Sequence, residues 1–297
     1  MKDPAPARPL DQDGADPLSA LAGLPEVSEA VAAAREACTE LRWHPALRRR
    51  TAEAAAESRA RGAASSALLE GAEVAGSQGS LPVVRDLLRG ARTWPDQPDP
   101  VWRTLRAAVQ VTAATEHVGV AALAAPLQVL TRLHLAAGSP LLPAEQVGRP
   151  RQGAEQSREW VELGPAPAPG EVEQRLAEVM DLVRALPGGR SPTLLVAAVV
   201  HAEIVTLRPF VAGNGLVARA MERVVLRAGG LDTTGALVPE AGHAHKVGAD
   251  YRGALTAYVS GGPGGVRLWL LHCAQAVVDG AGEGERLAGA ILAGRTG

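Results

Sequence analysis

The chain has 297 residues, of which 46% are hydrophobic and only 3% aromatic, so it can bury a large core built mainly from Ala, Leu and Val. This composition favours helices over sheets, and we expect an all-α fold. The formal net charge of −2 gives no electrostatic reason to expect nucleic acid or a membrane surface as a partner. No apolar run reaches the length that spans a bilayer, and no signal-peptide apolar region is visible, which predicts a cytoplasmic protein.

Residues that commonly bind metals are poorly spaced for that purpose. Cys38 and Cys273 are far apart in the sequence, which predicts two buried thiols and neither a disulfide nor a metal site. His201 and Glu203 lie two positions apart on an expected helix, so their side chains point in different directions and do not form a metal-binding pair. The sequence therefore predicts no metal site, and it contains no indication of an oligomeric state.

The chain is predicted to have four parts. Residues 1–18 are rich in Pro, Asp and Ala without periodicity, which is typical of a disordered tail. Residues 19–47 are predicted to form a helical extension and residues 48–280 a single, mostly helical domain. Residues 281–297 are predicted to form a C-terminal helix or tail.

The expected helices have apolar residues at helical spacing, or continuous apolar composition, and are bounded by Pro or Gly. They cover residues 25–41, 45–62, 126–137, 167–186, 193–206 and 217–226, and residues 266–278 are expected to close the core. Two further helices are expected between residues 80 and 119, with a break at 94–100. Residues 239–246 are predicted to be a polar loop.

The most informative stretch, residues 207–219, joins two long apolar helices and reads LRPFVAGNGLVAR. Pro209, Gly213 and Gly215 mark a loop, and Gly215 is expected to open the second helix. A glycine-containing loop that leads into a helix N-terminus gathers unpaired backbone N–H groups and the positive end of the helix dipole. We therefore expect this loop to bind an anion.

The same stretch resembles the signature loop of the Fic family, which reads His-Pro-Phe-x-Asp/Glu-Gly-Asn-Gly-Arg-x-x-Arg. Most Fic proteins are transferases that move AMP from ATP onto a hydroxyl group of a target protein. The chain matches the signature mainly at positions that shape the loop, which are Pro209, Phe210, Gly213, Asn214, Gly215 and Arg219. It departs at Arg208, Ala212 and Leu216. The resemblance implies an all-α Fic-fold bundle, extending over residues 48–280, with a short flap hairpin or loop beside the site.

A second resemblance lies at residues 66–71. Ser66, Glu70 and Gly71 are similar to the family's inhibitory motif, Ser/Thr-x-x-x-Glu-Gly/Asn. In the family this Glu pairs with the last Arg of the signature, here Arg219, and blocks productive placement of the γ-phosphate of ATP. A simpler interpretation is a helix that ends at a glycine cap. The resemblance predicts that Glu70 lies within ion-pair distance of Arg219.

Residues 147–153 and 160–165 resemble the family's flap, which holds an extended stretch of the target protein by strand addition. Arg149 and Arg151 belong to the first of these segments. We expect both side chains to lie in a solvated loop, and contact with a phosphate is the alternative.

The three departures remove groups that AMP transfer requires. Arg208 occupies the position of the family's catalytic His, and a guanidinium cannot accept a proton at physiological pH. Ala212 replaces the acidic residue that holds magnesium, and Leu216 replaces an arginine that neutralises phosphate. Loss of a general base alone lowers the rate by about 10²–10⁴-fold. Standard AMP transfer is therefore predicted to be absent, and no catalytic residue is assigned.

The residues that remain at the loop are Gly213, Asn214, Gly215 and Arg219, together with the new Arg208, and this set can bind an anion. The predicted function is a Fic-fold pseudoenzyme that binds ATP, another phosphate-bearing ligand or a protein partner without turnover and without magnesium. One alternative is an active transferase that moves a nucleotidyl or other phosphate-containing group onto a hydroxyl, with Arg208 stabilising that group. The other is a structural or protein-interaction module.

Overall fold

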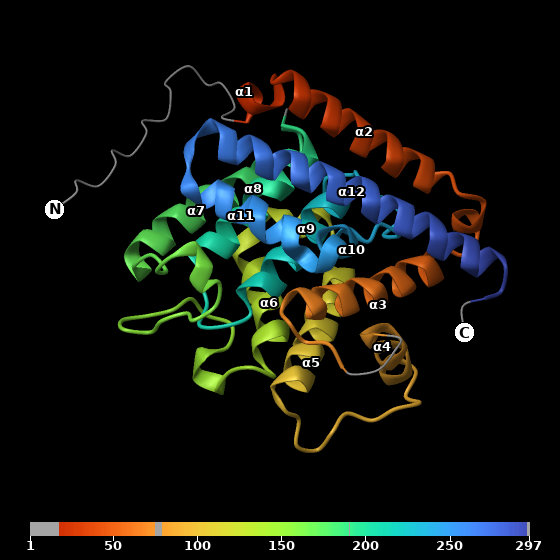
Figure 1. Ribbon diagram of the computed structural model, residues 1–297, viewed down its shortest axis with the longest axis horizontal. Helices are drawn as coiled ribbons and strands as arrows, with labels where there is room; N and C mark the ends of the chain where they lie inside the picture. Colours follow the sequence, from red (N-terminus) through yellow and green to blue (C-terminus); the bar gives the residue numbers. More distant parts are fainter. Residues whose placement is uncertain (1–17, 75–78, 190, 296–297) are drawn as a thin grey trace.

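The computed structural model describes residues 18–74, 79–189 and 191–295 of the chain (Figure 1). These residues form helices joined by loops and contain no strand, so the predicted all-α fold is confirmed. The α-helices are α1 (Ser19–Ala22), α2 (Pro25–Arg42), α3 (Thr51–Leu69), α4 (Ser80–Leu88), α5 (Pro100–Ala114), α6 (Pro126–Gly138), α7 (Pro169–Ala185), α8 (Thr193–Leu207), α9 (Asn214–Ala228), α10 (Pro239–His243), α11 (Ala249–Ser260) and α12 (Gly262–Leu292). None of the described helices has both the length and the apolar character needed to cross a bilayer.

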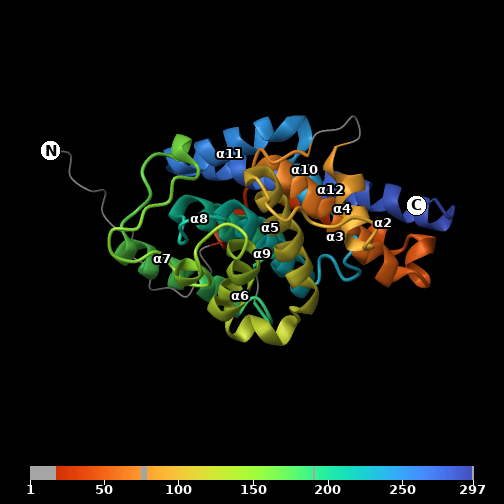
Figure 2. The same ribbon diagram turned by 90° about the horizontal axis from the view of Figure 1, so that it is seen from below.

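Helices α8 and α9 lie in the middle of the molecule in both views (Figures 1 and 2). α8 is apolar around almost its whole circumference, which is typical of a helix enclosed by other helices. It packs against α7, α9 and α12, while α5 and α6 contact α9 and α2 runs along α12 (Figure 1). The joint between α8 and α9, which carries the signature loop, is therefore supported by much of the core. Cys38 and Cys273 are both buried free thiols, as predicted.

The C-terminal helix α12 does not end at the predicted boundary at residue 280 but continues to Leu292. Two glycines explain how the helix continues past this point. A Cβ atom added at Gly280 would lie 2.7 Å from the carbonyl oxygen of Val238, and one added at Gly284 would lie 2.7 Å from that of Ala236. These glycines let α12 cross the 236–238 segment in backbone contact, so here they mark close packing and not a helix end.

Two other expectations about local structure were wrong. Residues 239–246 are not a polar loop, because Pro239 starts the short helix α10 and the carboxylate of Glu240 is buried against Arg223 at 2.6 and 2.8 Å. The expected helix over residues 45–62 is instead a 3₁₀ turn, Pro45–Arg48, followed by α3, which continues to Leu69. In the first case the polar side chains find partners inside the protein, which their polarity alone did not reveal.

The end of α3 agrees with both interpretations of residues 66–71. Ser66 lies in the last turn of the helix, Glu70 is the C-cap residue, and Gly71 follows with φ +74°. Glycine readily adopts this left-handed conformation, which commonly ends helices. The same termination directs Glu70 toward the N-terminus of α9, where its carboxylate contacts Arg219.

Candidate functional site

The loop between α8 and α9 is fixed by its own side chains. The Asn214 side chain accepts a hydrogen bond from the backbone N–H of Phe210 at 2.9 Å and donates one to the carbonyl oxygen of Phe210 at 2.9 Å. Phe210 is buried and stacks on the imidazole of His134, with ring centroids 3.7 Å apart. Gly213 has φ +86° and is the N-cap of α9. This arrangement directs the first backbone N–H groups of α9 toward one point.

His134 of α6 supports the loop between α8 and α9. The N–H of Gly148 donates to Nδ1 of His134 at 2.9 Å, so the ring proton lies on Nε2, which donates to the carbonyl oxygen of Ala212 at 3.1 Å. Burial lowers the pKa of His134 to about 4, despite the hydrogen bond to Ala212, and the ring is neutral at pH 7. His134 is a fully buried structural histidine.

A carboxylate of the chain itself occupies the N-terminus of α9. The N–H of Gly213 donates to Oε1 of Glu159 at 2.6 Å, and the N–H of Asn214 donates to Oε2 at 3.0 Å. The side-chain amide of Asn214 donates to the same Oε2 at 2.7 Å. These are the donors that the sequence assigned to an external anion, and a negative group at this place is favoured by the helix dipole.

Glu159 lies in a strongly perturbed environment. Burial, followed by the negative charge of Glu70, raises its pKa, whereas the hydrogen bonds from Gly213 and Asn214 act in the opposite direction. The next residue, Trp160, is buried and has φ +54°, a left-handed conformation that is unfavourable for a bulky side chain. Sequence reasoning missed Glu159 because a single Glu in a loop carries no pattern that separates it from solvated acidic residues.

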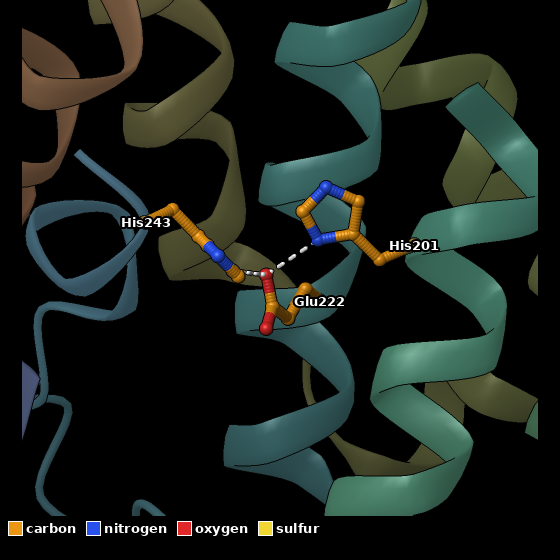
Figure 3. Close-up of side chains that lie close together, drawn as sticks. All are labelled: His201, Glu222 and His243. Carbon is orange, nitrogen blue, oxygen red and sulfur yellow. Dashed lines mark hydrogen bonds and ion pairs between the residues drawn. The ribbon is translucent and has the colours of Figure 1, made fainter. Parts of the chain in front are cut away.

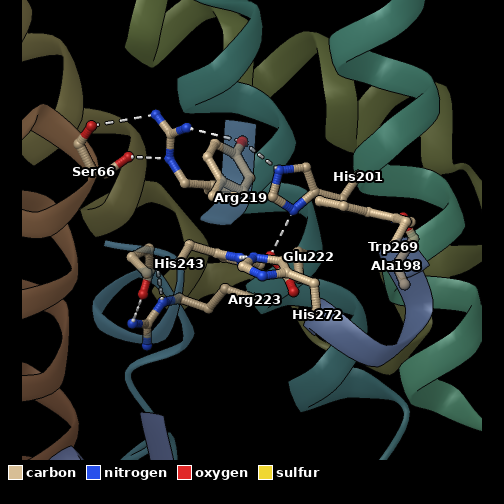
Figure 4. Close-up of polar contacts among 11 residues, drawn as sticks. Ser66, Ala198, His201, Arg219, Glu222, Arg223, His243, Trp269 and His272 are labelled. Carbon is tan, nitrogen blue, oxygen red and sulfur yellow. Dashed lines mark hydrogen bonds and ion pairs between the residues drawn. The ribbon is translucent and has the colours of Figure 1, made fainter. Parts of the chain in front are cut away.

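Arg219 and Glu70 form the predicted ion pair. Nη2 of Arg219 lies 2.5 Å from Oε1 of Glu70, and Nε donates to the Ser66 hydroxyl at 2.8 Å. Nη2 also donates to the Ser66 carbonyl oxygen at 3.2 Å, and Nη1 donates to Oη of Tyr251 at 3.3 Å. Figure 4 shows Arg219 directed toward Ser66. The buried guanidinium, 1% exposed, is thus bound to the inhibitory-motif residues and α11.

Gly215 has a steric role that the sequence did not reveal. A Cβ atom added to it would lie 2.2 Å from Oε1 of Glu70 and 3.0 Å from Cζ2 of Trp160. No larger residue fits while Glu70 and Trp160 keep these positions. The two carboxylates, Glu70 and Glu159, therefore both lie against the first turn of α9.

Arg208 does not face the N–H groups of the loop. Its Nη1 donates to the carbonyl oxygens of Glu159, Trp160 and Gly164 at 3.3, 3.2 and 2.8 Å. Burial, followed by the charge of Arg151, lowers the pKa of Arg208 from its ordinary value, and the side chain is 2% exposed. In this position the buried guanidinium satisfies its donors on the segment that carries Glu159, and the anion contact of Arg208 stays a prediction.

Arg151 also differs from expectation, because it is buried and not solvated. Its Nε donates to the carbonyl oxygen of Arg208 at 2.7 Å, and Nη2 donates to those of Pro167 and Leu207 at 3.0 and 3.3 Å. The segment over 147–165, which was compared with a flap, is a loop with one 3₁₀ turn, Val161–Leu163. Arg151 and Arg208 hold this loop against the joint between α8 and α9.

The helical bundle, with a glycine loop at the N-terminus of α9 and a Ser–Glu helix end packed on it, has the architecture of a Fic domain. Residues 128–226 match the sequence family described as the Fic/DOC family. A search of curated proteins gave no significant match. These findings support a Fic domain that includes residues 128–226.

Solved structures with this fold include a Fic family protein from Desulfovibrio desulfuricans G20, with a TM-score of 0.67, 21% identity, and coverage of 88% of this chain and 74% of that one. A fragment of Fic-1 from C. elegans has a TM-score of 0.64, 16% identity and coverage of 90% and 73%. A Fic domain containing signaling protein from Bacteroides thetaiotaomicron VPI-5482 has a TM-score of 0.59, 13% identity and coverage of 89% and 98%. At these identities the likeness concerns the fold.

Proposed function

We propose that this Fic domain is a pseudoenzyme that does not transfer AMP and is kept closed by its own carboxylates. The contact pattern of Arg208 carries the proposal. This residue stands at the position of the family's base, and its guanidinium donates to backbone carbonyls of the segment that carries Glu159. An arginine at this position thus removes the base and also holds in place the segment whose Glu159 carboxylate occupies the anion-binding loop.

The other two departures from the family signature also support the pseudoenzyme proposal. Ala212 offers only a methyl group where a metal ligand is needed, and its carbonyl oxygen accepts a hydrogen bond from His134. Leu216 is buried among apolar side chains and supplies no charge for a phosphate. An active transferase with altered chemistry would need Arg208 to face the transferring group, and its present contacts do not favour that alternative.

Occupation of the loop adds a second barrier. A phosphate-bearing ligand would have to displace Glu159 from the N–H groups of Gly213 and Asn214, because both cannot bind these donors at once. It would also approach Glu70, whose negative charge repels it. We therefore expect weak binding of such ligands, which does not depend on magnesium because Ala212 holds no metal ion.

The proposal is tested by incubating the chain with labelled ATP, magnesium or manganese, and a cell extract. The wild type, Glu70→Gly, Glu159→Ala and the double variant are all expected to transfer no label to themselves or to other proteins. Relief of closure gives ligand access but does not supply the base or the metal ligand. Labelling by the wild type that is abolished in Arg208→Ala would refute the pseudoenzyme proposal.

A further inference from the structure

A second cluster of polar side chains lies inside the core, next to α9 but away from its N-terminus. His201 of α8, Glu222 of α9 and His243 of α10 converge there (Figure 3). Nδ1 of His201 and Nε2 of His243 lie 2.7 and 2.8 Å from the same oxygen of Glu222. All three side chains are at most 2% exposed, and their potential ligand atoms lie within 4.8 Å of one another.

Among the residues that the structure describes, no arginine forms a direct ion pair with Glu222. Arg219 pairs with Glu70 and Arg223 pairs with Glu240, so the direct partners of Glu222 are the two imidazoles. A buried carboxylate whose direct partners are imidazoles is stabilised when it shares a cation with them, either a proton or a metal ion.

We propose that His201, Glu222 and His243 form a binding site for a divalent transition-metal ion of the zinc class. Two imidazole nitrogens and one carboxylate oxygen are a suitable donor set for such an ion, and a fourth tetrahedral position would remain open. With metal–ligand distances of about 2.0–2.2 Å, tetrahedral ligand atoms lie roughly 3.3 Å apart. The Glu222 oxygen must therefore move away from each nitrogen by about half an ångström.

The outer nitrogens of both rings have partners that suit this role. Nε2 of His201 lies 2.8 Å from Oη of Tyr251, and Nδ1 of His243 lies 3.1 Å from Nε2 of His272. His243 and His272 appear close together beside Glu222 in Figure 4. Each ring can keep its proton on the outer nitrogen and present the inner one as a ligand, as metal-binding histidines do. The edge of Trp269 packs on His201, and the indole is fixed by a 2.8 Å hydrogen bond to the carbonyl oxygen of Ala198.

The sequence predicted no metal site because the three residues are 21 positions apart in each step, and no short ligand motif has that spacing. The competing explanation for the cluster is that a proton on one imidazole, and not a metal ion, balances Glu222. The two explanations differ in metal content, which can be measured directly on the full chain.

The test uses the full-length chain purified without a metal-affinity column and dialysed against a chelator. Zn²⁺ or Co²⁺ is then added and the excess removed by gel filtration. We expect about one ion per chain, a higher melting temperature with Zn²⁺, and the strong visible absorption of tetrahedral Co²⁺. Metal content far below one ion per chain, or only the weak spectrum of octahedral Co²⁺, would refute the site and favour the proton.

Variants locate the ion. His243→Gln and Glu222→Gln should each lower Zn²⁺ affinity by at least about tenfold, whereas His245→Gln, which changes an exposed histidine two residues from His243, should leave it unchanged. Full affinity in folded His243→Gln would contradict the assignment. If the core variants do not fold, the Co²⁺ spectrum of the wild type still decides the question. The outcome is independent of any test of AMP transfer.

Discussion

Removing the Glu159 carboxylate is the most specific test of whether this side chain blocks the anion-binding N–H groups of the loop. In Glu159→Ala, the N–H groups of Gly213 and Asn214 and the side-chain amide of Asn214 lose an acceptor at 2.6–3.0 Å. A hydrogen bond to a charged group contributes about 1.5–3 kcal/mol net. Burial and the charge of Glu70 disfavour the ionised carboxylate of Glu159. We therefore take the net free energy with which this carboxylate occupies the loop as that of about one such hydrogen bond. Since 1.4 kcal/mol corresponds to a factor of ten, anion affinity should rise by about 10- to 100-fold.

The assay is titration calorimetry with pyrophosphate and with ATP, with and without magnesium. Glu162→Ala is a matched control. It removes the same charge from the same segment, but the Glu162 carboxylate pairs with Arg252 at 2.6 Å and not with the loop N–H groups. We expect the gain in affinity in Glu159→Ala only, with no requirement for magnesium. Equal affinities of the two variants and the wild type would refute closure by Glu159.

The raised pKa of Glu159 gives an independent readout. Its folded-state pKa lies above the ordinary value of 4.5, so the folded chain keeps a proton that the unfolded chain releases. Its contribution to stability is therefore present at low pH and is lost as the pH rises above 4.5 through the folded-state pKa. Compared with Glu159→Gln, the wild type should lose stability over this window with a slope of up to about 1.4 kcal/mol per pH unit. A constant difference between the two unfolding curves across pH would contradict this.

Three further predictions concern the groups that hold the site. Glu70→Ala removes the carboxylate partner of buried Arg219 and should lower the free energy of unfolding by about 2–4 kcal/mol in thermal or urea denaturation, whereas exposed Glu73→Ala should have little effect. Arg208→Ala removes a donor from three carbonyls, of which that of Trp160 still accepts from the N–H of Leu163, so it should lower stability by about 1–3 kcal/mol and raise pyrophosphate affinity in calorimetry. The pKa of His134 is lowered to about 4, so as the pH falls the unfolded chain gains a proton before the folded chain does. The free energy of unfolding, measured in urea, should therefore fall by about 2–3 kcal/mol between pH 7 and pH 4.5. His134→Gln should not show this fall.

The sequence predicted those parts of the fold that depend on pattern. Helices α8 and α9 follow from long apolar runs, and their junction follows from Pro209, Gly213 and Gly215. The ion pair between Glu70 and Arg219 followed from two motifs far apart in the chain, since each motif indicated the other. The helices depend on local patterning, which a single sequence displays directly, whereas the ion pair was predicted from the resemblance to the Fic family.

The sequence did not predict features that depend on the direction in which a single side chain points. Arg208 has four backbone carbonyls within reach, and its direction depends on how the 147–165 segment packs. Glu159 and His243 belong to segments with no periodicity, and each is brought to its site by tertiary contacts. Residues 239–246 were expected to be a polar loop, whereas the structure buries His243 against Glu222.

The central claim is that AMP transfer is absent because the required groups are missing from the loop, not because the loop is closed. The most direct measurement compares label transfer from ATP by two variants that both carry Glu70→Gly and Glu159→Ala. One variant is otherwise unchanged, and the other also carries Arg208→His, Ala212→Asp and Leu216→Arg. We predict that only the second variant incorporates label, because groups that act together in catalysis must be restored together. Equal labelling by the first variant would contradict the claim.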